Sequence, residues 1–149
     1  KARLNPYAAA PETMKLVAAI EPQIVASGID PALIELVKTR ASQINGCAFC
    51  IHMHTKDARA HGETEERLYL LNAWRESSLY TDKERAALAW TEALTLISET
   101  QAPDDVYEEL RKHFNEAETV NLTALIGVIN TWNRIAIGVR LQHPKAKTA

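Results

Sequence analysis

The 149-residue sequence has little of several features that mark specialised classes of protein. Its charges nearly cancel, with 17 Lys and Arg against 19 Asp and Glu, and they are scattered along the chain. Because no basic stripe is available to neutralise phosphates, we expect no nucleic-acid partner. No apolar run approaches the roughly 20 residues that a membrane-spanning helix needs, and the N-terminal residues lack the pattern of a signal peptide. We therefore expect a cytoplasmic protein with no membrane partner.

Strand signals are also missing, because no stretch alternates apolar and polar residues for long. Helix start and stop signals instead divide most of the sequence and predict an all-α fold, a compact bundle of about seven helices. We expect a single domain, 1–149, with a motif-bearing core at about 31–140. The helices are expected at about 11–20, 31–45, 47–61, 64–74, 81–97, 103–114 and 118–140. The last is apolar around much of its circumference, which predicts burial in the core or at a subunit contact.

Cysteine is scarce too, but both cysteines stand together in Cys47-Ala48-Phe49-Cys50. A loop this short cannot staple a fold, and in reducing compartments such pairs serve redox chemistry or metal binding. Two helical residues three apart have Cα atoms about 5 Å apart, within the range that a disulfide bridges. The pair opens the helix expected at 47–61, where unpaired backbone N–H groups and the helix dipole favour a thiolate.

Helical phase selects one histidine for this cysteine pair. At about 100° per residue, Cys47, Cys50 and His54 share one stripe of the helix, whereas His52 falls on the far side. Glu35 precedes Cys47 by twelve residues and belongs to the preceding helix. If the two helices form an antiparallel hairpin, Glu35 lies within roughly one turn of His54. The expected assembly is a nucleophilic thiol, a base and an orienting carboxylate.

The spacing Glu35-x11-Cys47-x2-Cys50-x3-His54 resembles the active-site signature of the carboxymuconolactone decarboxylase superfamily, in its alkylhydroperoxidase D-like branch. Three further stretches are similar to that branch: 40–47, 57–59 and 130–134. The decarboxylase branch lacks the C-x-x-C pair. The resemblance therefore does not imply lactone decarboxylation.

By this resemblance the protein is a thiol peroxidase, a peroxiredoxin-type oxidoreductase that reduces alkyl hydroperoxides. It implies Cys50 as the peroxidatic cysteine and Cys47 as the resolving one, with His54 and Glu35 in the proton relay. It also implies a homo-oligomer, a trimer or hexamer, and an external dithiol reductant, often a lipoyl-bearing protein. No cofactor and no metal are implied. Phe49 stands where the best-known members carry a second histidine, which implies a simpler relay and a lower activity.

Two other functions fit the same residues. One is a redox-sensing or oligomeric binding protein that uses the cysteine pair with little turnover; a thiol pKa near the ordinary value of about 8.5 for Cys50 favours it. The other is a metal-binding module with Cys47, Cys50, His54 and Glu35 as ligands, although structural zinc usually takes sulfur or nitrogen. The purely structural explanation is a pair of small buried side chains.

Overall fold

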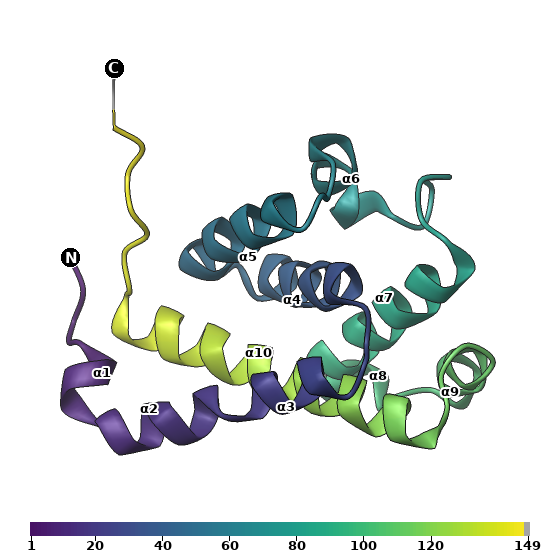
Figure 1. Cartoon of the computed structure of the whole chain (residues 1–149), viewed down its shortest axis with the longest axis horizontal. Helices are drawn as coiled ribbons and strands as arrows, with labels where there is room; N and C mark the ends of the chain where they lie inside the picture. Colours follow the sequence, from purple (N-terminus) through teal and green to yellow (C-terminus); the bar gives the residue numbers. More distant parts are fainter. Residues whose placement is uncertain (148–149) are drawn as a thin grey trace.

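The computed structural model describes residues 1–147, which fold into helices with no strand among them (Figure 1). The expected all-α class is therefore confirmed. The helical segments, in chain order, are α1 (Pro6–Ala9), α2 (Pro11–Ala18), α3 (Ile20–Ala26), α4 (Pro31–Asn45), α5 (Ala48–Ala60), α6 (Glu65–Tyr69), the 3-10 turn η1 (Leu71–Ala73), α7 (Asp82–Thr95), α8 (Ile97–Thr100), α9 (Asp104–Arg111) and α10 (Glu116–Val139).

Helix α4 lies at the centre of the fold, where it packs against α5, α7 and α10 (Figure 1). The side chain of Asp30 caps its first turn by accepting a hydrogen bond from the backbone N–H of Ala32, and Pro31 occupies the first helical position. Gly46 ends the helix in the left-handed conformation, with φ +70°. The sequence predicted both ends because few residue types satisfy the backbone there.

The N-terminal helices differ from the prediction. The helix expected at 11–20 is α2, and α3 then runs through Pro22, which had been expected to interrupt the helix. Pro22 is tolerated because it stands in the first turn of α3, where a backbone N–H has no partner within the helix. The short helix α1 was not predicted; the side chain of Asn5 caps it by accepting from the N–H groups of Tyr7 and Ala8.

Two other expected helices are each divided. The helix expected at 64–74 consists of α6 and η1, and the one expected at 81–97 consists of α7 and α8, which meet at Leu96 in a non-helical conformation. The capping box predicted at the start of α7 is confirmed. Thr81 accepts from the N–H of Glu84, and the Glu84 carboxylate accepts from the N–H of Thr81.

Helix α10 packs against α3, α4, α5 and α7 and lies along much of the molecule (Figure 1). It has 24 residues, and an 18-residue window within it has a mean hydropathy of 1.3, so by length and composition alone it could cross a membrane. The expectation that no segment reaches this level was wrong. Polar residues interrupt the apolar sequence of α10 but lower its mean hydropathy only slightly. The core helix of a globular protein passes the same test, and α10 packs against several other helices of this fold. Only 39% of its apolar window is buried, and Val120 is largely exposed.

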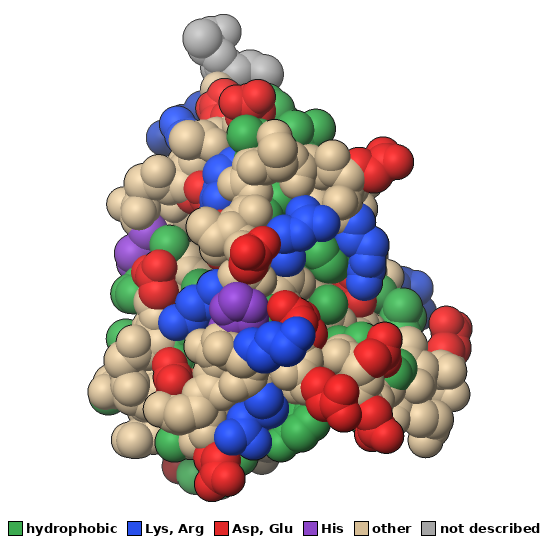
Figure 2. Space-filling view, turned by 90° about the vertical axis from the view of Figure 1, so that its right-hand side faces the viewer, with side chains coloured by type: hydrophobic (Ala, Val, Ile, Leu, Met, Phe, Trp, Pro, Cys, Tyr) green, Lys and Arg blue, Asp and Glu red, His purple; other side chains and the backbone are tan. Residues whose placement is uncertain are grey.

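Acidic and basic side chains are intermixed on the face shown in Figure 2, which is the right-hand side of Figure 1. Charged side chains in and next to α6, η1 and α7 pair closely. Arg67 binds the carboxylates of Glu63 and Glu84, and Arg75 binds Glu92. Pairing of this kind spreads both signs of charge over the surface instead of concentrating one.

The N-terminal segment lies against the C-terminal end of α10. The backbone N–H of Arg3 donates to the carbonyl of Val139 at 2.7 Å, and its guanidinium donates to the carbonyl of Gly138 at 3.1 Å. The ring of Tyr7 stacks on Trp132, with centroids 6.3 Å apart. These contacts bring α1 and α2 to the end of α10 that also contacts the cysteines.

Candidate active site

The two cysteines lie at the turn between α4 and α5. The backbone N–H of Cys47 bonds to the carbonyl of Ser42 in the last turn of α4, at 3.0 Å. Cys47 is the N-cap of α5, with an extended backbone (φ −85°, ψ 95°), and its sulfur accepts from the N–H of Cys50 at 3.3 Å. The helix therefore begins at Ala48, one residue later than expected. The phase argument holds for Cys50 and His54, which are inside the helix, but not for Cys47.

A disulfide joins Cys47 to Cys50. Their Cα atoms are 5.3 Å apart, close to the separation expected from the sequence. Both residues are almost fully buried, with exposures of 1% and 3%, and they pack with Ala136 of α10. The turn between α4 and α5 thus holds the two sulfurs at bonding separation.

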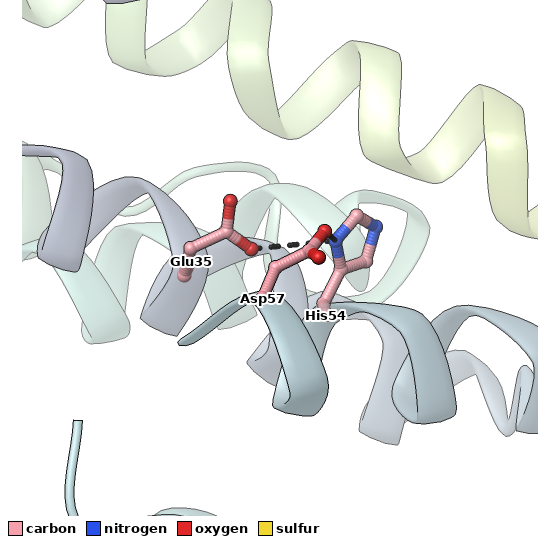
Figure 3. Close-up of side chains that lie close together, drawn as sticks. All are labelled: Glu35, His54 and Asp57. Atoms are coloured by element: carbon pink, nitrogen blue, oxygen red, sulfur yellow. Dashed lines mark ion pairs between the residues drawn. The ribbon is translucent and has the colours of Figure 1, made fainter. Parts of the chain in front are cut away.

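Glu35 and His54 face each other across the α4–α5 hairpin (Figure 3). Nδ1 of His54 lies 3.4 Å from Oε2 of Glu35, and both side chains are buried. The pair is close enough for an ionic contact, although neither atom has a well-aligned hydrogen bond. The expectation that Glu35 lies within a turn of His54 is confirmed. The other ring nitrogen of His54 points away from the carboxylates (Figure 3).

His52 lies apart from this group, as its helical phase predicted. Its ring stacks on the ring of His143 at a centroid distance of 4.9 Å. His52 does not line the cavity that Cys50 and His54 share. His61 is exposed at the end of α5. His54 is therefore the histidine of this helix that accompanies Cys50.

Two charged residues of the site were not predicted from the sequence. Nζ of Lys38 lies 3.0 Å from Oε1 of Glu35 and also binds the carboxylate of Glu21, and the lysine side chain is buried. On the other side, Oδ2 of Asp57 lies 4.0 Å from Nδ1 of His54 (Figure 3). Each lies three residues from a predicted site residue on the same helix, a spacing that brings side chains together. That spacing was the signal that could have revealed them.

These neighbours set the ionisation of Glu35. Burial opposes the charged form, but the contact with His54 and the positive charge of Lys38 outweigh it, so the pKa of Glu35 is lowered from its ordinary value. Glu35 is therefore a carboxylate at neutral pH. An ionised carboxylate beside Nδ1 orients the imidazole.

A cavity of about 210 Å³ opens onto Cys50 and His54. Its wall carries one acidic residue, Glu21, which is the carboxylate that also binds Lys38. The large apolar side chains around it are Tyr7, Phe49, Met53, Trp132 and Leu141. A concave apolar site with a few convergent polar groups is typical of small-molecule binding.

Glu35, His54 and Asp57 could also hold a metal ion, since their ligand atoms lie within 4.8 Å of one another. Two features oppose this. The sulfurs proposed as metal ligands are joined to each other in the disulfide. The ammonium group of Lys38, 3.0 Å from Glu35, repels a cation at that carboxylate. The cluster is better suited to moving a proton.

The sequence profile of the carboxymuconolactone decarboxylase family matches residues 11–93, a stretch that contains Glu35, both cysteines and His54. The chain belongs to the carboxymuconolactone decarboxylase family. The uncharacterised protein YdfG of Bacillus subtilis is 47% identical over 137 residues, which cover 92% of this chain and 93% of that protein.

Solved structures of similar proteins place this family member in the alkylhydroperoxidase D-like branch, as the resemblance predicted. A protein of unknown function from Agrobacterium tumefaciens, whose name proposes that it is the antioxidant defence protein AhpD, is 51% identical. The two structures agree with a TM-score of 0.95, covering 98% of this chain and 100% of that one. An uncharacterised peroxidase-related protein from Ralstonia eutropha, with an AhpD core, shares the fold at 17% identity, with a TM-score of 0.81 over 93% of this chain and 74% of that one.

Proposed function

We propose that this protein is a thiol-dependent peroxidase that reduces alkyl hydroperoxides through Cys47 and Cys50. The observation that carries the proposal is the pairing of this disulfide, at the start of α5, with a buried Glu35–His54 contact on the same hairpin. Membership of the family and the similarity to the Agrobacterium protein support it.

The first step oxidises Cys50. His54, held by Glu35, accepts the proton of the Cys50 thiol, and the N-terminal end of α5 stabilises the thiolate. The thiolate attacks one oxygen of the hydroperoxide, so that an S–O bond forms while the O–O bond breaks. The alkoxide takes the proton from His54 and leaves as an alcohol. Cys50 becomes a sulfenic acid.

The second step closes the disulfide. The thiol of Cys47 attacks the sulfenic sulfur of Cys50, the S–S bond forms, and water leaves. The two cysteines have together given two electrons to the peroxide. In the disulfide form the Cα atoms are 5.3 Å apart, close to the separation of two helical residues three apart, so the step is expected to need no large backbone movement. An external dithiol must then reduce the disulfide, and we propose a lipoyl-bearing protein for this role.

The cavity supports an organic substrate. Its apolar walls can bury an alkyl or aryl group, while Cys50 and His54 supply the polar groups that meet the peroxide. Phe49 lines this cavity, and it stands where the best-known members of the branch carry a histidine, so it supplies apolar surface in place of a proton donor. We therefore expect cumene hydroperoxide to be reduced faster than hydrogen peroxide.

The test compares the wild type with Cys50→Ser and Cys47→Ser, using cumene hydroperoxide as oxidant and dihydrolipoamide as reductant. Cys50→Ser is expected to abolish both turnover and sulfenic acid formation. Cys47→Ser is expected to abolish turnover while still forming the sulfenic acid, which a dimedone-type probe detects. It is therefore the matched control, because it too lacks one thiol of the pair.

The remaining outcomes each decide between functions. Unchanged turnover in both variants refutes the proposal. Sulfenic acid in Cys50→Ser but not in Cys47→Ser reverses the two roles. A wild-type protein that is oxidised once by peroxide but does not turn over with any dithiol is a redox sensor instead.

We also propose that the protein is a homo-oligomer, a trimer or hexamer. Large apolar side chains are exposed on α2, α3 and α10, including Leu16 at 73%, Val25 at 47% and Val120 at 67%. Exposed apolar surface of this kind is a common feature of subunit contacts. Sedimentation velocity tests this proposal, and a stable monomer at micromolar concentration contradicts it.

A further inference from the structure

We infer that the reductant reaches the disulfide through a second cavity, on the Cys47 side, and attacks the sulfur of Cys47. The inference rests on the proposed function, since it assigns the reducing half of the same cycle. It gives the two cysteines separate points of access, one for the peroxide and one for the thiol.

The two cavities touch different cysteines. The cavity of about 210 Å³ is lined by Cys50 and not by Cys47. A second cavity of about 160 Å³ is lined by Cys47 and not by Cys50. It lies between the start of α5 and the C-terminal end of α10, where Ala48, Ile137 and Arg140 contribute to its wall.

Three apolar residues line both cavities and so form the wall between them: Phe49, Ala136 and Leu141. Phe49 lies between the two cysteines in the sequence, and the disulfide packs with Ala136. The disulfide therefore lies at the partition, with one of its two cysteines lining each cavity. Phe49 therefore separates the two cavities with an apolar ring. A histidine at that position would place a polar ring between them.

The chemistry of thiol–disulfide exchange favours attack at Cys47. Exchange is faster when the departing sulfur is the better leaving group, that is, the thiolate of lower pKa. Cys50 is inside the first turn of α5, and His54 is four residues further on. Cys47 is the N-cap residue, and its sulfur accepts a hydrogen bond from the backbone N–H of Cys50, so the start of the helix stabilises a thiolate at either cysteine. Attack on Cys47 expels Cys50, the cysteine that has His54 one turn further along the helix, which makes Cys50 the better leaving group.

The exchange balances as follows for a dithiol. One thiolate of the reductant attacks Sγ of Cys47, the Cys47–Cys50 bond breaks, and Cys50 leaves as a thiolate. The second thiol, after losing its proton, attacks the reductant sulfur of the mixed disulfide and releases Cys47 as a thiolate. The protein gains two electrons and the reductant becomes a disulfide. The two protons of the dithiol pass to the two cysteines or to solvent.

The shape and charge of the second cavity indicate the kind of reductant. About 160 Å³ admits a narrow dithiol arm and excludes a folded protein, so a protein reductant must present its thiols on an extended group. Arg140, exposed immediately after α10, supplies positive charge at this cavity. A cation there favours the thiolate form of the incoming reductant and attracts an acidic carrier.

The experiment separates the two half-reactions in three matched variants, each an exposed alanine replaced by tryptophan. Ala48→Trp narrows the second cavity, and Ala18→Trp narrows the peroxide cavity. Ala60→Trp changes the far end of α5 and lies in neither cavity. Reduction is measured by stopped flow, with dihydrolipoamide added to protein whose disulfide was formed with diamide. Oxidation is measured by adding cumene hydroperoxide to the dithiol form.

Ala48→Trp is expected to slow reduction on the order of tenfold, because exchange depends on access to the attacked sulfur, and to change oxidation less than about twofold. Ala18→Trp is expected to do the reverse, and Ala60→Trp to change neither. Slower reduction in Ala18→Trp, with Ala48→Trp unaffected, overturns the inference. Because diamide forms the disulfide without peroxide, reduction can be measured even if the proposed peroxidase activity is absent.

A trapping measurement identifies the attacked sulfur directly. Oxidised wild-type protein is mixed with glutathione, quenched rapidly with an alkylating agent, and digested for mass spectrometry. The inference predicts glutathione on Cys47 and the alkyl group on Cys50. Glutathione on Cys50 overturns it, even if the tryptophan variants fold poorly.

Discussion

Lys38→Met is expected to destabilise the protein strongly, because it leaves the buried carboxylate of Glu35 without its cation. The lysine side chain is 5% exposed and its Nζ lies 3.0 Å from Oε1 of Glu35, itself 8% exposed. Lys38 also binds Glu21, which is more exposed at 31%. Methionine occupies a similar volume without charge, so the substitution tests the ion pair with little change in packing.

The distance sets the size of the effect. At 3.0 Å, two unit charges attract by about 5 to 6 kcal/mol at an effective dielectric constant of about 20. The measured cost of removing one partner of a buried pair is smaller, about 3 to 5 kcal/mol, because the remaining charge relaxes or is neutralised. We expect the free energy of unfolding to fall by about 3 kcal/mol at neutral pH. For a chain of this length, that lowers Tm by about 6 to 12 °C.

Urea unfolding followed by tryptophan fluorescence measures this loss, with the protein concentration held constant because an oligomer gains stability with concentration. The control is a double-mutant cycle with Glu35→Gln, which removes the stranded charge. The double variant is expected to recover much of the loss. A loss below about 1 kcal/mol in Lys38→Met, or additive losses in the double variant, refutes the ion-pair argument.

The pH dependence of this effect has a definite sign. In the wild type the pKa of Glu35 is lowered from 4.5, so its stabilising contribution is complete above about pH 4.5 and is lost as the pH falls through the lowered value. Without Lys38, only the contact with His54 opposes the effect of burial, so the pKa of Glu35 rises from its wild-type value and the carboxyl group is neutralised at a higher pH than in the wild type. The stability gap between wild type and variant therefore narrows as the pH falls. A gap that stays constant down to about pH 4 contradicts this assignment.

Three further predictions concern the relay, the core and the metal hypothesis. His54→Asn is expected to slow peroxide oxidation of Cys50 by about 100-fold or more, as loss of a general base does; a loss below tenfold contradicts the relay. Asn133→Ala is expected to lower the free energy of unfolding by about 2 to 4 kcal/mol, because the fully buried amide of Asn133 hydrogen-bonds to Ser42 at 3.0 Å and to Asn45 at 2.9 Å, between α10 and α4. Urea unfolding measures this loss, with the exposed substitution Arg134→Ala as the control. Equal stability of the two variants contradicts the prediction. EDTA is expected to leave peroxide turnover unchanged, since the relay needs no metal; loss of activity that Zn²⁺ restores favours the metal hypothesis.

The contact between Glu35 and His54 could be predicted because it depends on local geometry. Both helices have strong end signals, and a short turn forces them to run antiparallel. Register along such a hairpin follows from the rise per residue. The same reasoning failed at Cys47, because a residue just before a helix does not follow the helical phase, and the sequence did not show that Cys47 is the N-cap.

Other parts of the site could not be predicted because they depend on distant segments. The peroxide cavity combines Tyr7 from α1 with Trp132 from α10, and no local pattern indicates that these rings stack. Lysine side chains are usually solvated, and the sequence around Lys38 did not indicate that this one is buried. Its partner Glu21 lies in α3, beyond the end of the helix expected at 11–20.

Free thiols counted before and after one addition of cumene hydroperoxide test the central claim most directly. The reduced wild-type chain contains two cysteines. The account predicts that equimolar peroxide removes both thiols with formation of one equivalent of alcohol, and that dihydrolipoamide restores both. Thiols that remain reduced in the presence of peroxide, or are lost irreversibly, contradict a dithiol peroxidase.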